Sequence, residues 1–241
     1  MTLRGSFMFE ELDYAPTPIG PVSLRRRMDP VLKREVFEVK LGEEFLMSSA
    51  YTASEEALST LGLDAVTGEE LDVLVGGLGL GYTAKAALDC PKTAKLYIAE
   101  YLVPVIDWHR RGLLPMGTAL TDDPRTQIIE GDFFAMAAAQ SFGPVNGAAC
   151  LDAILVDIDH SPEALLSPHS RPFYDEESLA RLSAMLRPGG VFGLWSDDPP
   201  DARFTARLEA AFGKGWAEPV TIERPLAGTP IIQTVYFGQV A

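Results

Sequence analysis

The fold of this chain is most readily inferred from the stretch Leu71-Asp72-Val73-Leu74-Val75-Gly76-Gly77-Leu78-Gly79-Leu80-Gly81-Tyr82-Thr83-Ala84, in which an apolar run gives way to four glycines. The short run before the glycines is typical of a buried parallel strand. The sequence after them, from Ala84 to Leu88, favours a helix whose N-terminus faces the turn. The stretch therefore predicts a strand, a tight turn and a helix, the arrangement with which open α/β folds hold nucleotide-like ligands.

Composition limits the class of protein. The chain has 241 residues, 47% of them hydrophobic, which is enough to bury a sizeable core. No apolar run approaches the roughly 20 residues of a spanning helix, and the N-terminus lacks the apolar segment of a signal peptide, so we expect a cytoplasmic protein with no membrane partner. The net charge of −14 argues against nucleic acid as a partner, because phosphates are bound by clustered Lys and Arg, and it fits a cationic small molecule better.

The first part of the chain has the pattern of a small β segment. Prolines and glycines separate short runs such as Phe7 to Tyr14, and Val36 to Leu41 with Glu44 to Met47 has the pattern of a hairpin. The sequence from Ser54 to Leu58 is typical of a capped helix start. The predicted division is residues 1–53 for an N-terminal β-hairpin segment and 54–241 for a Rossmann-like domain.

From Leu71 onward, predicted strands alternate with predicted helices, which implies a parallel sheet covered on both faces. The first five strands are Leu71 to Val75, Lys95 to Ala99, Arg125 to Ile129, Leu151 to Val156 and Val191 to Trp195. Two more strands follow and are joined by only Arg224 to Pro230, so they should be antiparallel, because a parallel return needs about a dozen residues or more. The expected fold is α/β: a Rossmann-like, doubly wound, mostly parallel seven-stranded sheet with an antiparallel final strand, plus the N-terminal β segment.

The spacing of the glycines distinguishes between ligand classes. A dinucleotide fingerprint requires Gly at positions one, three and six, but the sixth position counted from Gly77 is Tyr82. What remains is Gly77-x-Gly79-x-Gly81, a looser pattern that resembles sulfonium-nucleoside sites, where bare backbone lets the methionine-derived part approach the turn. A glycine turn that only packs a helix against a strand is the alternative.

Polar residues follow the next three strands, at the edge where ligands of open sheets bind. Glu100 ends the second strand and can accept hydrogen bonds from both ribose hydroxyls, with a solvent-facing charge as the alternative. Gly131-Asp132-Phe133 follows the third strand, where such folds set an Asp against the adenine amino group and an apolar residue against its ring. Asp132 can also cap the next helix. Asp157-Ile158-Asp159-His160 ends the fourth strand, and three polar groups there are hard to explain as packing.

Several segments together carry a family resemblance: Val73 to Gly79, Ile98-Ala99-Glu100 with Trp108, Glu130-Gly131-Asp132, Leu151 to Asp157, and Phe173-Tyr174 before a helix. They resemble the polyamine synthase (spermidine synthase) family, over about residues 36 to 237. In that family, a class I methyltransferase-like domain uses decarboxylated S-adenosylmethionine to put an aminopropyl group on an amine. The resemblance therefore implies a transferase of polyamine biosynthesis and, by analogy, a homodimer.

The resemblance also implies roles for individual residues. Glu100 would bind the ribose, Asp132 the adenine, and Asp157 the reacting amine as base or hydrogen-bond acceptor; Asp157 and Asp159 are the expected catalytic residues. The residues expected to bind S-adenosylmethionine or its decarboxylated form, as co-substrate, are Gly76, Gly77, Leu78, Gly79, Gly81, Glu100, Tyr101, Asp132, Phe133 and Asp157. We expect no metal site, because Asp157, Asp159 and His160 are neighbours at the end of one strand and rarely converge on one ion. His109 and His169 are expected at the surface.

The sequence departs from the family in the acceptor region. Family members carry an Asp directly after the opening glycines, whereas residues 76–81 contain no acid. The family's Asp-Glu-x-x-Tyr-x-Glu segment becomes residues 50–56 and keeps only the last acid, and Trp195 replaces the usual Gln. We therefore expect the donor pocket to be kept and the polyamine pocket to be changed. Two alternatives stay open: a methyltransferase with a non-polyamine acceptor, and a noncatalytic nucleoside-binding domain.

Overall fold

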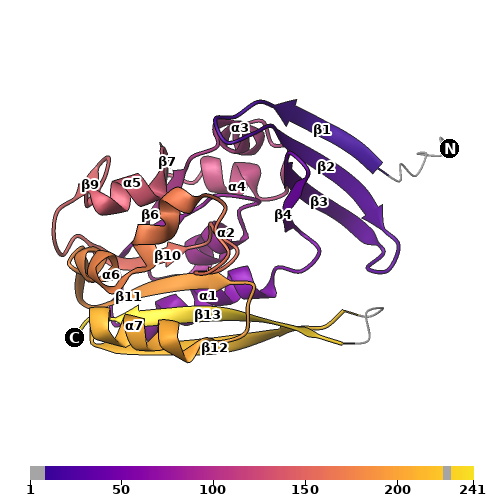
Figure 1. Cartoon of the computed structure of the whole chain (residues 1–241). Helices are drawn as coiled ribbons and strands as arrows, with labels where there is room; N and C mark the ends of the chain where they lie inside the picture. The colour runs from indigo at the N-terminus through magenta and orange to yellow at the C-terminus, as the bar shows by residue number, and fades with distance from the viewer. Residues whose placement is uncertain (1–8, 225–228) are drawn as a thin grey trace.

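The chain builds a seven-stranded mixed sheet and, beside it, a four-stranded antiparallel sheet (Figure 1). The computed structural model describes residues 9–224 and 229–241. The expected start of the first strand at Phe7, and residues 225–228 of the predicted connection, lie outside the described residues. A two-stranded hairpin, which the sequence did not predict, is formed by β8 (Ser141–Phe142) and β9 (Val145–Asn146).

The four-stranded sheet is the predicted N-terminal β segment. Its strands are β1 (Phe9–Ala15), β2 (Val22–Asp29), β3 (Arg34–Leu41) and β4 (Glu44–Ser48), and each pairs antiparallel with the next. Val22, Leu24 and Val39 are fully buried and join a core that extends into the larger sheet. The division after residue 53 falls at the first residue of the first helix and stays a prediction.

The seven-stranded sheet confirms the predicted fold class. Its strands are β5 (Leu71–Gly76), β6 (Thr93–Glu100), β7 (Thr126–Glu130), β10 (Leu151–Val156), β11 (Leu186–Ser196), β12 (Lys214–Ile222) and β13 (Ile231–Gln239), in the order β12-β13-β11-β10-β5-β6-β7. The strands from β11 to β7 are parallel, and β13 runs antiparallel to both of its neighbours. The order reverses between β10 and β5, so the carboxyl ends of these strands form the crevice where ligands of open sheets bind.

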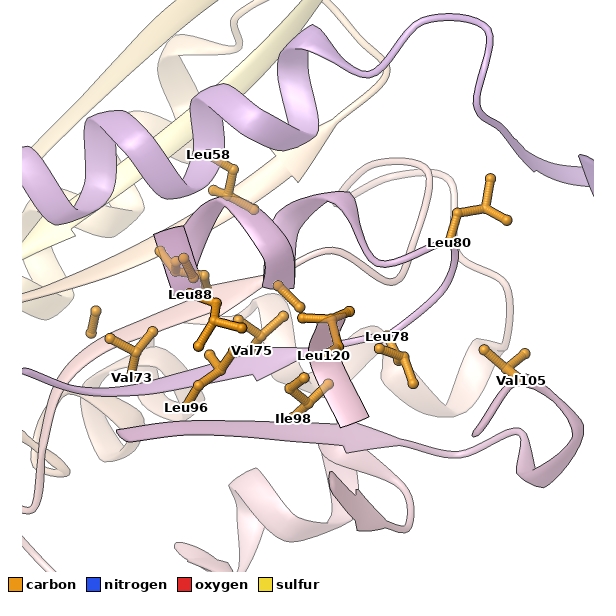
Figure 2. Close-up of a cluster of buried hydrophobic side chains, with 14 of the residues drawn as sticks. Leu58, Val73, Val75, Leu78, Leu80, Leu88, Leu96, Ile98, Val105 and Leu120 are labelled. Carbon is orange, nitrogen blue, oxygen red and sulfur yellow. The ribbon is translucent and has the colours of Figure 1, made fainter. Parts of the chain in front are cut away.

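Helices cover both faces of this sheet. They are α1 (Ala53–Ala65), α2 (Tyr82–Asp89), α3 (Val103–Arg110), α4 (Gly117–Thr121), α5 (Phe133–Ala138), α6 (Glu176–Ser183) and α7 (Ala202–Phe212), with a 3₁₀ helix η1 (Pro168–Tyr174). Side chains alternate along β5, so Val73 and Val75 join the core under α1 to α4, while Leu74 joins the core under α5 to α7. Figure 2 shows the first core, with Leu58 of α1 and Leu88 of α2 above the two valines. Among the described residues, none of the helices is both long enough and apolar enough to span a bilayer.

The start of α1 differs from the prediction. The helix begins at Ala53 after Thr52, whose side chain makes no capping hydrogen bond, so the prediction that Ser54 caps the helix is wrong. Ser54 lies inside the first turn and is fully buried. Its hydroxyl hydrogen-bonds to side chains of β11 and β13 as well as to Glu55, which places this turn beside the carboxyl ends of the sheet strands.

Candidate active site

Two cavities adjoin at the carboxyl ends of the central strands. The first, which we call the Glu100 cavity, has a volume of about 240 Å³ and lies over the ends of β5, β6, β7 and β10. The second, the Glu55 cavity, has a volume of about 270 Å³ and lies between α1, the glycine turn and the segments after β10 and β11. The residues common to both walls are Leu46, Met47, Gly79, Asp157 and Ile158. The two cavities therefore meet where Asp157 ends β10.

The structure brings most of the predicted binding residues to the Glu100 cavity. Those that line it are Gly77, Gly79, Glu100, Tyr101, Asp132, Phe133, Asp157 and Asp159. Leu78 and Gly81 line the Glu55 cavity instead. Gly76 lines neither cavity; it lies against the Phe133 ring, which a Cβ at this position would approach to 2.7 Å.

The glycine turn is shaped by close contacts as well as by space for a ligand. Gly77 has a φ of +91°, and a Cβ there would lie 2.2 Å from the carbonyl oxygen of Asp157. Gly79 has a φ of +47°, and a Cβ there would lie 2.9 Å from Sδ of Met47 in β4. Both positions favour glycine because L side chains disfavour this backbone region, and at Gly77 the backbone of Asp157 also fills the space. The packing role that the sequence left open is therefore real, and it coexists with the cavity.

Glu100 holds the glycine turn in place. Its Oε2 accepts hydrogen bonds from the backbone N–H of Leu78 at 2.9 Å and of Gly79 at 3.3 Å, and its Oε1 accepts one from Leu102 at 2.7 Å. Burial raises the pKa of Glu100, and these backbone donors oppose the rise. The side chain is only 7% exposed, so the alternative of a solvent-facing charge is wrong. Any ribose bound here would meet a carboxylate that the turn has already oriented.

Asp132 and Phe133, which follow β7, also line the Glu100 cavity. Asp132 is exposed and caps α5, because its Oδ1 accepts hydrogen bonds from the backbone N–H of Phe134 at 2.9 Å and of Ala135 at 3.4 Å. Its Oδ2 takes no part in this cap. Phe133 is 2% exposed, and Phe134, which the sequence did not single out, lines the cavity beside it.

Asp159 is buried and lines the Glu100 cavity. Its Oδ1 accepts a hydrogen bond from the backbone of Leu166 at 2.7 Å, and its Oδ2 accepts hydrogen bonds from the hydroxyls of Ser170 at 2.8 Å and Tyr174 at 2.7 Å. With three donors on one carboxylate, this side chain fixes the segment from Leu166 to Tyr174, part of which lines the cavity. The geometry therefore fits a positioning role better than proton transfer.

Asp157 and Glu55 are two carboxylates that line the same cavity. Asp157 accepts a hydrogen bond from Oγ1 of Thr83 at 2.6 Å, and burial raises its pKa to about 6. Burial, and then the charge of Asp157, raise the pKa of Glu55 to about 7. Two like charges in one poorly solvated space disfavour each other, so the pair holds about one negative charge between about pH 6 and 7.

Sequence reasoning missed Glu55 because it took Glu56 as the acid retained from the family motif. Helical periodicity gives the signal that was overlooked. Glu55 precedes Leu58, Ser59 and Gly62 by three, four and seven positions, and these three residues are buried, so Glu55 belongs to the inward stripe of α1. Glu56 is exposed.

His109 is fully buried, so its expected surface position is wrong. Its Nε2 lies 2.8 Å from the carbonyl oxygen of Gly79. Because a carbonyl can only accept, Nε2 carries the hydrogen and Nδ1 is unprotonated, and Nδ1 is buried without a partner among the described residues. His109 thus fixes the carbonyl of the glycine turn, and burial lowers its pKa.

This buried histidine predicts a pH-dependent stability. The folded-state pKa of His109 lies below the unfolded value near 6.5, so below that pH the unfolded chain binds a proton that the folded chain resists. The free energy of unfolding should therefore fall as the pH is lowered below about 6.5, by at most about 1.4 kcal/mol per pH unit from this group. His109→Gln keeps an N–H donor for Gly79 and should reduce the slope in urea unfolding between about pH 5 and 7. An unchanged slope would show that His109 is not the source, and the exposed His169→Gln is the matched control.

Metal ligands are not gathered at this site. In the ranges 9–224 and 229–241, no group of three or more His, Cys, Asp or Glu side chains is placed to hold a metal ion. His160 lies 3.3 Å from Glu44 at the Glu55 cavity, and His169 is exposed beside the Glu100 cavity.

Comparison with known proteins supports the resemblance seen in the sequence. No protein family model matches the chain. A polyamine aminopropyltransferase of Nitrosomonas europaea is 28% identical over 238 residues, which span 90% of this chain and 69% of that protein. Putrescine N-methyltransferase 1 of Nicotiana tabacum is 30% identical over 136 residues, which span 56% of this chain but only 33% of that protein.

A solved structure extends the similarity to the fold. Spermidine synthase in complex with the transition-state analogue AdoDATO superposes with a TM-score of 0.73 at 18% identity, over 96% of this chain and 74% of that one. At that identity the likeness concerns the fold. The chain is therefore a spermidine synthase-like protein with the class I S-adenosylmethionine-dependent methyltransferase fold.

Proposed function

We propose that this protein is a transferase that moves an alkyl group from a sulfonium nucleoside to a small amine, and that the group is aminopropyl. The observation that carries the proposal is the position of Asp157, which lines both cavities at the point where they meet. A donor in the Glu100 cavity and an acceptor in the Glu55 cavity would bring their reacting atoms together beside this carboxylate. The two relatives reported above, a polyamine aminopropyltransferase and a putrescine N-methyltransferase, are both named as enzymes that transfer a group to an amine.

The Glu100 cavity suits the nucleoside part of the donor. Glu100 would accept hydrogen bonds from ribose hydroxyls, and Oδ2 of Asp132, which is outside the helix cap, would accept one from an adenine amino group. Phe133 and Phe134 would offer apolar surface to the adenine ring. We assign Gly77, Gly79 and Tyr101 to the same site because they line the same wall. Leu78 and Gly81, on the Glu55 cavity, would face the reacting end of the donor.

The charges around the junction favour decarboxylated S-adenosylmethionine over S-adenosylmethionine. Among the described residues, neither cavity wall includes a Lys or Arg that could pair with the carboxylate of S-adenosylmethionine. The backbone N–H groups of Leu78 and Gly79 already donate to Glu100. A buried carboxylate without partners is strongly disfavoured, whereas the ammonium of the decarboxylated donor matches acidic walls.

The residues of the chain would supply positioning and one proton transfer. Displacement at a sulfonium needs the nucleophile and the carbon aligned, and the two adjoining cavities would provide that alignment. An aliphatic amine is protonated at neutral pH and must lose a proton before it attacks. Asp157 would accept this proton at its carboxylate, while Thr83 holds the carboxylate in place. Asp159 would act by fixing the segment above the donor.

The second candidate is an S-adenosylmethionine-dependent methyltransferase. It is favoured by the 30% identity to the putrescine N-methyltransferase and by the missing acid after the opening glycines. The third candidate is a noncatalytic nucleoside-binding domain, in which only the Glu100 cavity would bind a ligand. The proposal further includes a cytoplasmic location, a place in polyamine biosynthesis and a homodimer, the last by analogy with related enzymes.

One assay separates the three readings. The protein is incubated with decarboxylated S-adenosylmethionine or with S-adenosylmethionine, with putrescine or a panel of other amines, and the nucleoside products are identified by mass. We expect methylthioadenosine to form only when an amine is present, as aminopropyl transfer requires. Amine-dependent S-adenosylhomocysteine would instead support methylation, and binding without turnover would support the noncatalytic domain. If neither nucleoside raises the melting temperature, the assignment of the Glu100 cavity is wrong.

A further inference from the structure

A chain of hydrogen bonds lines one wall of the Glu55 cavity and centres on Ser54. Nε1 of Trp195 donates to Oγ of Ser54 at 2.9 Å. The same Oγ lies 2.7 Å from Oε2 of Glu55 and 2.7 Å from Oε1 of Gln233. Nε2 of Gln233 donates to Oδ1 of Asp197 at 2.8 Å, which fixes the orientation of the amide.

The hydrogens in this chain can be counted. An amide oxygen carries no hydrogen, so the single hydroxyl hydrogen of Ser54 is needed for the contact with Gln233. The lone pair that faces Trp195 is used by the indole N–H. The remaining 2.7 Å contact, between Ser54 and Glu55, then needs a hydrogen from the carboxyl group of Glu55. An ionised Glu55 would leave two oxygens at that distance with no hydrogen between them, so the arrangement calls for a neutral Glu55.

Asp157, by contrast, is arranged to be charged. It accepts the hydroxyl hydrogen of Thr83, and that hydrogen bond lowers its pKa against the effect of burial. Burial and the charge of Asp157 raise the pKa of Glu55 to about 7, although a hydroxyl hydrogen donated by Ser54 would lower it, so Glu55 takes the proton of the pair first. The empty cavity therefore holds mainly one charged and one neutral carboxyl group between about pH 6 and 7.

We propose that Glu55 is a specificity-determining residue, protonated in the empty cavity, that releases its proton to solvent when the second ammonium group of a diamine acceptor binds there. The inference rests on the proposed function, because it requires an amine acceptor whose first ammonium pairs with Asp157. A monoamine brings one positive charge and is matched by Asp157 alone. A diamine brings two, and the second is matched only when Glu55 is ionised.

Other ionisable groups near Glu55 would contribute a background to any pH dependence. The groups that line the same cavity or act on Glu55 or on its neighbours are Tyr51, Glu56, Tyr82, His160, Asp197 and, beside Tyr82, Arg34. A comparison of two acceptors on one protein removes the part of this background that does not depend on the acceptor. The Glu55→Gln variant then separates Glu55 from any other group of the cavity that responds to the second ammonium, such as His160.

The test is calorimetric binding of 1,4-diaminobutane and of 1-aminobutane to the protein saturated with methylthioadenosine. Titrations in buffers of different ionisation enthalpy give the number of protons released. The diamine should release more protons than the monoamine near pH 7, and its affinity should weaken by up to about tenfold per unit as pH falls below 7. The monoamine should show a smaller slope.

The variant Glu55→Gln tests the residue itself. Its amide can still donate to Ser54, as the protonated carboxyl does, but it does not titrate. It should remove the extra proton release and weaken diamine binding at pH 8. Glu56→Gln, at the exposed neighbouring position, should keep the extra proton release.

Each outcome bears on one of the two proposals. If Glu55→Gln keeps the extra proton release, or if the two amines release the same number of protons from the unaltered protein, the inference about Glu55 is wrong. The inference about Glu55 is also wrong if the nucleoside binds and the diamine does not. Absence of nucleoside binding would overturn the proposed function instead. The comparison of two amines on the unaltered protein needs no variant, so a poorly folding Glu55→Gln would not remove the test.

Discussion

Replacing Asp157 with asparagine is expected to lower turnover by about 10²- to 10⁴-fold, the usual contribution of a positioned general base. Asparagine keeps an oxygen that can accept the hydrogen bond of Thr83, so the end of β10 should keep its shape. It cannot take a proton from the ammonium group of the acceptor. The measurement is kcat with saturating donor and amine, together with the dissociation constant of the nucleoside, which should change little.

The pH profile of the unaltered enzyme gives an independent check of this role. Burial raises the pKa of Asp157 to about 6, and the residue must be ionised to accept a proton. Activity should therefore fall as pH drops through about 6, and rise towards neutral pH as the carboxylate forms. A loss of nucleoside affinity in Asp157→Asn that accounts for the whole loss of activity would contradict the catalytic assignment.

The parts of the fold that the sequence predicted well are those with a strong local pattern. Leu151–Val156 has the predicted bounds, because it is a short, mostly apolar run that ends at Asp157. The helix Gly117–Thr121 and the hairpin strands at Ser141–Phe142 and Val145–Asn146 were not predicted. These elements have five or two residues each, too few to show any periodicity.

The candidate site divides in a similar way. Glu100, Asp132 and Asp157 could be placed together from the sequence because the carboxyl ends of parallel strands meet at one edge. Glu55 and His109 could not, because their roles depend on tertiary contacts. His109 meets the glycine turn only because α3 packs against it, and Glu55 meets Asp157 only because α1 covers the end of β10.

Replacing Glu100 with alanine is expected to weaken both nucleoside binding and the fold. The loss of charge-assisted hydrogen bonds to the ribose should reduce the binding free energy by about 1.5 to 3 kcal/mol. The same change leaves the backbone N–H groups of Leu78, Gly79 and Leu102 without their acceptor at a position that is 7% exposed. The free energy of unfolding should fall by about 3 kcal/mol or more, because each buried unsatisfied donor costs about 1 to 3 kcal/mol.

Glu100→Gln separates these two effects. Glutamine keeps one oxygen, which can serve the N–H groups of Leu78 and Gly79, but its NH₂ group cannot accept from Leu102, and it has no charge to offer the ribose. Its stability, from urea unfolding, should lie between those of the parent and the alanine variant, while its nucleoside affinity should fall nearly as far as that of alanine. If alanine weakened binding with no loss of stability, the turn would not depend on Glu100, and the three backbone donors would have found other acceptors. If alanine lowers both the free energy of unfolding and the nucleoside affinity, the residue that binds the ribose also stabilises the turn beside which the ribose binds.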